Sequence, residues 1–125
     1  MSHISKIELE VKDLGTLGQA CRRLGLQLVR GQKTFKWYGT EDSKCDHAIK
    51  VPEANYEIGV LKTGNAFGLQ CDYYDPAIGK AIGQNGGLLK QAYAVERTKT
   101  EARRKGYTVI EKATPQGIRL QLQIA

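Results

Sequence analysis

The stretch from Leu26 to Tyr74 constrains the fold most, because apolar and polar residues alternate along most of its length. An alternation with a period of two is typical of strands that bury one face. The segments between the alternating runs are short and contain Gly, Pro, Asn and Ser, which favour tight turns. Strands that follow one another through short turns pair antiparallel. The stretch therefore predicts strands at Leu26–Arg30, Thr34–Tyr38, Lys44–Val51, Tyr56–Lys62 and Ala66–Tyr74.

Helical segments flank this stretch on both sides. A first strand is indicated by the alternation at residues 7–11, and Asp13 then caps a helix that stops at Gly25. After Tyr74, glycines and a proline predict a loop at residues 75–87, with room for at most a short helical turn. A long helix follows at residues 88–105, and two strands at Tyr107–Ala113 and Ile118–Ile124 end the chain. The alternation in the last strand predicts that Ile118, Leu120, Leu122 and Ile124 face inward.

The resulting order of elements is β-α-β-β-β-β-β-α-β-β. Strands in runs, with helices that do not alternate with them, favour the α+β class. We expect a single mainly antiparallel β-sheet with two helices packed on one face. A length of 125 residues is ordinary for one domain, so residues 1–125 are predicted to form a single α+β domain.

Composition favours an intracellular protein with an anionic partner. No apolar run approaches the roughly 18 residues that a membrane span needs, and the alternating N-terminus does not resemble a signal peptide. The cysteine count of 3 is odd, which does not indicate a disulfide framework and suits a reducing cytoplasm. The net charge of +6 favours nucleic acid, an acidic protein or a phosphorylated ligand as partner.

Several short motifs, taken in order, resemble one family along nearly the whole chain. The motifs are Met1-Ser2-His3, Tyr56-Glu57-Ile58-Gly59, Asp72-Tyr73-Tyr74, Tyr93-Ala94, Glu101-Ala102 and Ile118-Arg119-Leu120. In this order the chain resembles the hypothetical chloroplast reading-frame thirty-five family, a domain of unknown function from cyanobacteria and plastids. The chain departs from it where tyrosines replace a tryptophan pair and Val95-Glu96 replaces Tyr-His.

This resemblance implies a compact α+β fold and no established activity. Members of the family resemble accessory proteins more than enzymes, and an AAA-type ATPase is the candidate protein partner that the family implies. Any role of the family's histidine would be absent here, because Glu96 stands at its place.

No set of residues predicts catalysis or a cofactor. The histidines, His3 and His47, lie in no nucleophile signature, and the glycine-rich segments lack the Lys and Ser/Thr of a phosphate-binding loop. Cys45 and His47 could point the same way from a strand, but zinc needs four ligands. The sequence therefore predicts no catalytic residue, no metal and no cofactor; enzymatic activity stays open, with a non-enzymatic role favoured.

The long helix carries the most basic surface. Lys90, Arg97 and Arg104 recur every seven residues and share one helix face, with Tyr93 beside them. The opposite face is a core stripe that Lys99 interrupts, formed by Leu88, Ala92, Val95 and Ala102 and widened by Leu89. The stem of Lys99 is expected to lie over the sheet. The row is either a solvated face of the helix or a surface for an anionic partner, and the sequence leaves both open.

Further candidate binding residues lie in the strands. Phe35 and Trp37 are expected in the core, which leaves Lys36 and Tyr38 outside. The remaining candidates for an anionic ligand are Asp72, Tyr74 and Arg119.

Three functions remain open at this stage. The favoured one is a small basic accessory or adaptor protein that binds a macromolecular partner. The alternatives are a nucleic-acid-binding protein that uses the basic helix, and a protein that binds or sequesters a small anionic ligand.

Overall fold

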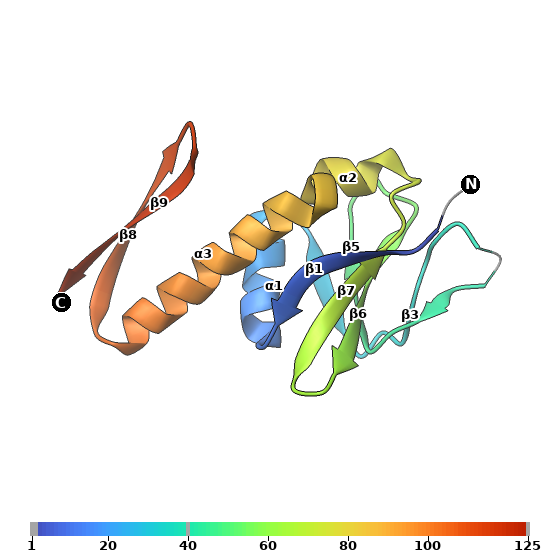
Figure 1. Ribbon diagram of the computed structural model, residues 1–125, viewed down its shortest axis with the longest axis horizontal. Helices are drawn as coiled ribbons and strands as arrows, with labels where there is room; N and C mark the ends of the chain where they lie inside the picture. Colours follow the sequence, from blue (N-terminus) through green and yellow to red (C-terminus); the bar gives the residue numbers. More distant parts are fainter. Residues whose placement is uncertain (1–2, 40, 125) are drawn as a thin grey trace.

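The computed structural model describes residues 3–39 and 41–124, and its centre is a five-stranded antiparallel sheet (Figure 1). The strands lie side by side in the order β1, β7, β6, β5, β2. Their bounds are β1 Ser5–Val11, β2 Gln27–Arg30, β5 His47–Lys50, β6 Glu57–Thr63 and β7 Ala66–Cys71. The Met1-Ser2 start of the N-terminal motif lies outside the described residues. The predicted α+β class is confirmed.

Two helices, α1 (Leu14–Arg23) and α3 (Gly87–Arg104), cover one face of this sheet. The predicted cap at Asp13 is present, because its carboxylate accepts the Gly15 N–H at 2.9 Å and the Thr16 hydroxyl at 2.8 Å. The main core joins both helices to the inward side chains of the strands, among them Leu17, Cys21, Ile58, Val60, Leu69 and Leu89. None of the described helices is long and apolar enough to cross a membrane.

The segment before α3 is more helical than the sequence analysis predicts. It forms helix α2 (Pro76–Ile82) and a short 3-10 helix, η1 (Gln84–Gly86). Asp75 caps α2 with its side chain, and the proline that follows it occupies the first position, where a helix needs no N–H donor. Ile78 and Ile82, one turn apart, are fully buried. The glycines indicated a loop, but the Asp75 cap and the burial of the two isoleucines stabilise a helix instead.

A small two-stranded sheet covers the other face of the main sheet. It consists of β3 (Thr34–Phe35) and β4 (Ser43–Lys44). β3 is shorter than predicted, and the single strand predicted at Lys44–Val51 is divided between β4 and β5. Phe35 is fully buried and lies directly on Gly59, where any Cβ would overlap its ring. Trp37 is only partly buried at the edge of the same cluster. The prediction that Phe35 belongs to the core is confirmed.

The last two strands, β8 (Tyr107–Thr114) and β9 (Gly117–Ile124), form a hairpin outside the main sheet. In the described part of the chain they pair only with each other, and they pack against α3. Figure 1 shows this hairpin, in orange and red, beyond the C-terminal end of α3. The sequence analysis expects Leu122 and Ile124 to face inward, but they are 46% and 87% exposed. This expectation is wrong because the hairpin has no sheet to cover its apolar face near the chain end.

Candidate functional site

The basic row predicted on α3 is only partly a surface row. Arg97 and Arg104 are exposed, whereas Lys90 is half-buried. Arg104 forms an ion pair with Glu101, one turn earlier, at 3.1 Å. Both side chains are largely exposed, so this pair contributes little to stability. Arg97 therefore keeps the most accessible charge of the row.

Tyr93 belongs to the core and not to the row. Only 4% of the residue is exposed, and its phenol oxygen accepts the backbone N–H of Lys12 at 3.1 Å. The core stripe of α3 is centred on Leu89 and Tyr93, whereas Leu88, which the sequence analysis places in the stripe, is 45% exposed. The burial of Tyr93 and the exposure of Leu88 both follow if α3 is rotated slightly about its axis relative to the orientation that the sequence predicts.

A small hollow of about 190 Å³ lies beside α3. Lys12, Arg97 and Arg104 line it together with Asp13 and Glu101. Cations and carboxylates are thus mixed around the hollow, so an anion would meet repulsion as well as attraction there.

Asp72 is buried and uses its carboxylate to hold the neighbouring backbone in place. It is 1% exposed, and its two oxygens accept the backbone N–H groups of Tyr74 at 2.9 Å and Tyr38 at 3.2 Å. The two tyrosine rings meet edge to face with centroids 4.9 Å apart, and each residue is more than half exposed. Lys36 is also exposed nearby in the chain. Asp72 thus holds together an exposed aromatic pair, which we call the tyrosine pair.

Arg119 does not join Asp72 and Tyr74. It lies on β9 opposite Lys112, on the polar face of the hairpin. Figure 1 shows the hairpin at the opposite end of the molecule from the end of β7, after which Asp72 follows. The structure therefore does not assemble the ligand site that the sequence analysis built from these residues.

The opposite face of the hairpin is apolar and partly open. Tyr107 lies across from Ile124, and Val109 lies across from Leu122. Tyr107, Leu122 and Ile124 are 36%, 46% and 87% exposed. These residues form a contiguous patch at the open end of the hairpin, which we call the hairpin-end patch.

Cys45 and His47 make separate local contacts. The Cys45 thiol donates to the carbonyl oxygen of Gln32 at 3.3 Å, and His47 Nδ1 accepts the N–H of Gly31 at 2.9 Å. Burial lowers the pKa of His47, which favours the neutral ring that this bond requires. Over residues 3–39 and 41–124, no group of at least three His, Cys, Asp or Glu side chains is arranged to hold a metal ion.

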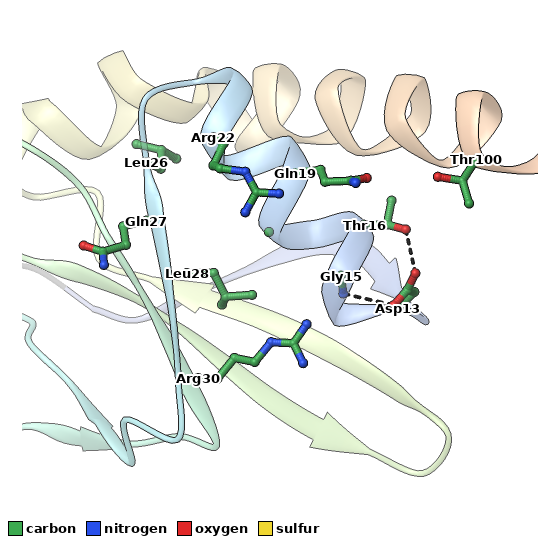
Figure 2. A pocket seen from close by; sticks show the side chains of 11 residues that line it. Asp13, Gly15, Thr16, Gln19, Arg22, Leu26, Gln27, Leu28, Arg30 and Thr100 are labelled. Atoms are coloured by element: carbon green, nitrogen blue, oxygen red, sulfur yellow. Dashed lines mark hydrogen bonds between the residues drawn. The ribbon is translucent and has the colours of Figure 1, made fainter. Parts of the chain in front are cut away.

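A larger hollow, which the sequence analysis misses, lies between α1 and the edge strand β2 (Figure 2). Its volume is about 630 Å³, and we call it the α1–β2 hollow. Figure 2 shows Arg22 reaching into it from α1 and Arg30 from the end of β2, with Leu28 between them. Both arginines can be read from the sequence, but the fact that they line the same hollow depends on how α1 packs against β2, which no local spacing encodes.

A family comparison now places the chain among known sequences. Residues 20–122 match the model of a family described as proteins of unknown function, DUF1257. The chain belongs to this family. No curated protein and no solved structure matches the chain significantly.

The part that matches the DUF1257 model contains the features described above. It includes both arginines of the α1–β2 hollow, the tyrosine pair and most of the hairpin. It begins after Asp13, which caps α1. The family description assigns none of these features a role, so their function must come from their physical chemistry.

This DUF1257 chain also contains a cluster of ion pairs that the sequence did not predict. Arg23 contacts Glu96 and Glu111, and Lys99 contacts the same two carboxylates at 3.5 and 3.2 Å. Hydrogen bonds from Arg23, and then from Lys99, hold the pKa of Glu111 at about 2. Lys99, which interrupts the predicted core stripe, is thus explained by these partners. The cluster joins α1, α3 and β8 and does not form an open site.

Proposed function

We propose that this protein is a non-enzymatic accessory or adaptor protein that binds a protein partner through the hairpin-end patch. The observation that carries the proposal is the exposure of Leu122 and Ile124 beside Tyr107 on one face of the hairpin. Fully burying an exposed isoleucine or leucine side chain is worth roughly 1.5–3 kcal/mol. Most of the gain from covering the patch would therefore come from Ile124, which is 87% exposed. Exposed apolar side chains that gather in one patch commonly mark a protein interface.

The charge around the patch indicates what kind of partner fits. Arg103 and Lys105 are exposed at the end of α3, just before Tyr107 in the chain. An acidic rim around an apolar centre would complement these cations and increase the rate of association. Arg119, a candidate from the sequence, lies on the opposite, polar face of the hairpin and takes no part in this proposal.

The finer sequence-based assignments belong to the same proposal. They are membership of the chloroplast reading-frame thirty-five group, a cytoplasmic location and an AAA-type ATPase as the partner. The partner's identity would be decided by sequencing the protein that binds the patch.

The proposal can be tested by affinity purification with matched variants. Leu122→Asp places a charge in the patch, whereas Gln121→Asp places the same charge on the polar face one residue away. Wild type and Gln121→Asp should retain the same stoichiometric protein, and Leu122→Asp should lose it while staying folded. Equal recovery with both variants, or no stoichiometric protein with the wild type, would overturn the proposal.

Nucleic-acid binding is the second candidate, and the exposure of Arg97 and Arg104 beside Lys12 favours it. The intervening carboxylates of Asp13 and Glu101 weaken it. Affinity for a nucleic acid should fall steeply with salt and fall further in Arg97→Gln. A filter-binding titration at low salt that retains neither single- nor double-stranded nucleic acid would exclude this candidate.

A further inference from the structure

Arg22 and Arg30 stand out because both line one hollow and neither is paired with a carboxylate within the described residues. Within residues 3–39 and 41–124, neither guanidinium takes part in an ion pair, whereas the neighbouring Arg23 pairs with two glutamates. Both line the α1–β2 hollow. Two like charges that face one cavity repel each other, and a bound anion would relieve this repulsion.

Among the described residues, Asp13 is the only acidic one that lines the α1–β2 hollow, and both of its oxygens accept hydrogen bonds. One oxygen accepts the N–H of Gly15, and the other accepts the hydroxyl of Thr16. The pKa of Asp13 is lowered mainly by the Thr16 and Gly15 hydrogen bonds, and Arg30 contributes less. Asp13 thus acts as a helix cap, and its single negative charge is outnumbered by the two guanidinium groups that line the same hollow.

The other walls of the hollow fit a small organic anion. Gln19 and Gln27 supply amide groups, and Leu26 and Leu28 supply apolar surface. The volume of about 630 Å³ falls within the range of roughly 300–1,000 Å³ that is usual for small-molecule sites. An anionic group at the arginines and a less polar body against the leucines would use all of these walls.

We propose that the α1–β2 hollow binds a small molecule that carries a phosphate or diphosphate group, held by Arg22 and Arg30. A guanidinium donates two parallel hydrogen bonds to phosphate oxygens. A terminal phosphate carries a charge of about −1.5 to −2 at neutral pH, so it complements two guanidinium groups better than a carboxylate with a single charge.

A long polyanion fits the structure less well than a small molecule. The cations beyond the hollow, Arg97 and Arg104, line the separate smaller hollow beside α3. Asp13 and Thr16 line both hollows, so a strand running from one to the other would pass the Asp13 carboxylate. The repulsion there favours a ligand that ends within the α1–β2 hollow.

The direct test is calorimetric titration of the full-length protein with pyrophosphate at low salt. Saturable binding at one site is expected, with affinity at least tenfold weaker in Arg22→Gln and in Arg30→Gln, equivalent to about 1.4 kcal/mol. Arg119→Gln removes the same charge from the hairpin and should bind as tightly as the wild type. No saturable binding, or the same loss in all variants, would overturn the proposal.

A second measurement needs no variant and covers the case in which a substitution unfolds the protein. Pyrophosphate should shift the Nε–Hε NMR signals of Arg22 and Arg30 in the wild-type protein and leave that of Arg119 unchanged. Shifts of similar size at all arginines would indicate general ion binding and contradict a defined site.

Other probes separate a phosphorylated small molecule from the alternatives. A nucleoside diphosphate should bind at least as tightly as pyrophosphate, because its body adds contacts, and citrate should bind more weakly than either. Citrate binding as tightly as pyrophosphate would reject phosphate recognition. A short single-stranded oligonucleotide that binds more tightly and loses affinity in Arg97→Gln would replace the proposal with nucleic-acid binding.

The hairpin proposal and this one can fail independently. Leu122→Asp changes the hairpin-end patch and should leave pyrophosphate affinity unchanged, because Leu122 does not line the α1–β2 hollow. A loss of pyrophosphate binding in Leu122→Asp would contradict the assignment of the ligand to this hollow.

Discussion

Arg23 at the end of α1 forms a two-point ion pair with Glu111 of β8, although 88 residues separate them. Nη2 of Arg23 donates to Oε2 of Glu111 at 2.8 Å and to Oε2 of Glu96, also at 2.8 Å. This arginine therefore links three elements, α1, α3 and the hairpin. The interaction fixes where the hairpin packs against the rest of the protein.

Replacing Arg23 should destabilise the protein markedly. Arg23→Met keeps the apolar stem but leaves Glu96, which is 9% exposed, with Lys99 as its remaining partner. We expect a loss of about 1.5–3 kcal/mol, the usual range for a hydrogen bond to a charged group. Urea denaturation measures the loss. The control is Arg22→Met, because Arg22 is adjacent in the chain but takes no part in the ion pairs of Arg23; it should change stability by less than about 0.5 kcal/mol. Equal urea denaturation midpoints for the two variants would contradict this role of Arg23.

Stability should also depend on the ionisation of Glu111. Its pKa is held at about 2, below the ordinary 4.5, chiefly by the hydrogen bonds from Arg23. Because the folded pKa is depressed, this contribution is fully present above about pH 4.5 and is lost as pH falls towards 2. The wild type should therefore be more stable than Glu111→Gln at neutral pH, and the difference should shrink on acidification.

Urea denaturation at several pH values checks this dependence. In an Arg23→Met background, the effect of Glu111→Gln should be smaller and should vary less with pH, because the main cause of the shift is gone. A difference between wild type and Glu111→Gln that stays constant from neutral pH down to about pH 2.5 would show that Glu111 is not coupled to folding in this way.

The sheet predicts a contrast between two glycines that sequence alone does not distinguish. A Cβ at Gly59 would overlap the Phe35 ring, whereas a Cβ at Gly68 on the adjacent strand meets nothing within 4 Å. Gly59→Ala should cost about 1–3 kcal/mol through overpacking. Gly68→Ala should be neutral or stabilise slightly, because alanine reduces the entropy of the unfolded chain. Both are measured by urea denaturation.

The double variant Phe35→Ala, Gly59→Ala supplies the control for this contrast. Once the ring is removed, Gly59→Ala should cost much less than it does alone, and the two changes should be clearly non-additive. Additive losses would mean that Gly59 is needed for a reason other than the approach of Phe35.

Local patterns predicted most of the elements because those elements satisfy local rules. The alternation at residues 57–63 and 66–71 matches strands whose inward side chains reach the core, and Asp13 caps α1 as its side chain allows. At Asp75 the same capping chemistry was present in the sequence, but the following glycines masked it. The boundaries of β3 and β4 could not be predicted, because the alternation there continues beyond the paired residues.

The functional features depend on contacts between distant segments, and for this reason the sequence did not predict them. The sequence places Lys99 on the core stripe without a partner, whereas in the structure its ammonium group lies 3.2 Å from the carboxylate of Glu111 on the hairpin. Arg22 and Arg30 line one hollow only because α1 packs against the edge strand β2. In contrast, Asp72 and Tyr74 are two residues apart, and their local hydrogen bond makes them a structural pair.

The cysteines should differ in reactivity although all three are free. Burial raises the pKa of Cys21 to about 12 and that of Cys71 to about 11, and both lie in the main core with no exposed surface. Burial also raises the pKa of Cys45, but this residue is 8% exposed and lies in the smaller cluster under β3. Because the thiolate is the reactive form, iodoacetamide at about pH 8 should modify Cys45 first, through local opening. Cys21 and Cys71 should react only when the whole protein unfolds. Mass spectrometry should therefore find a single early adduct, which Cys45→Ser abolishes. Early modification of Cys21 or Cys71 would show that the main core opens as readily as the small β3–β4 sheet.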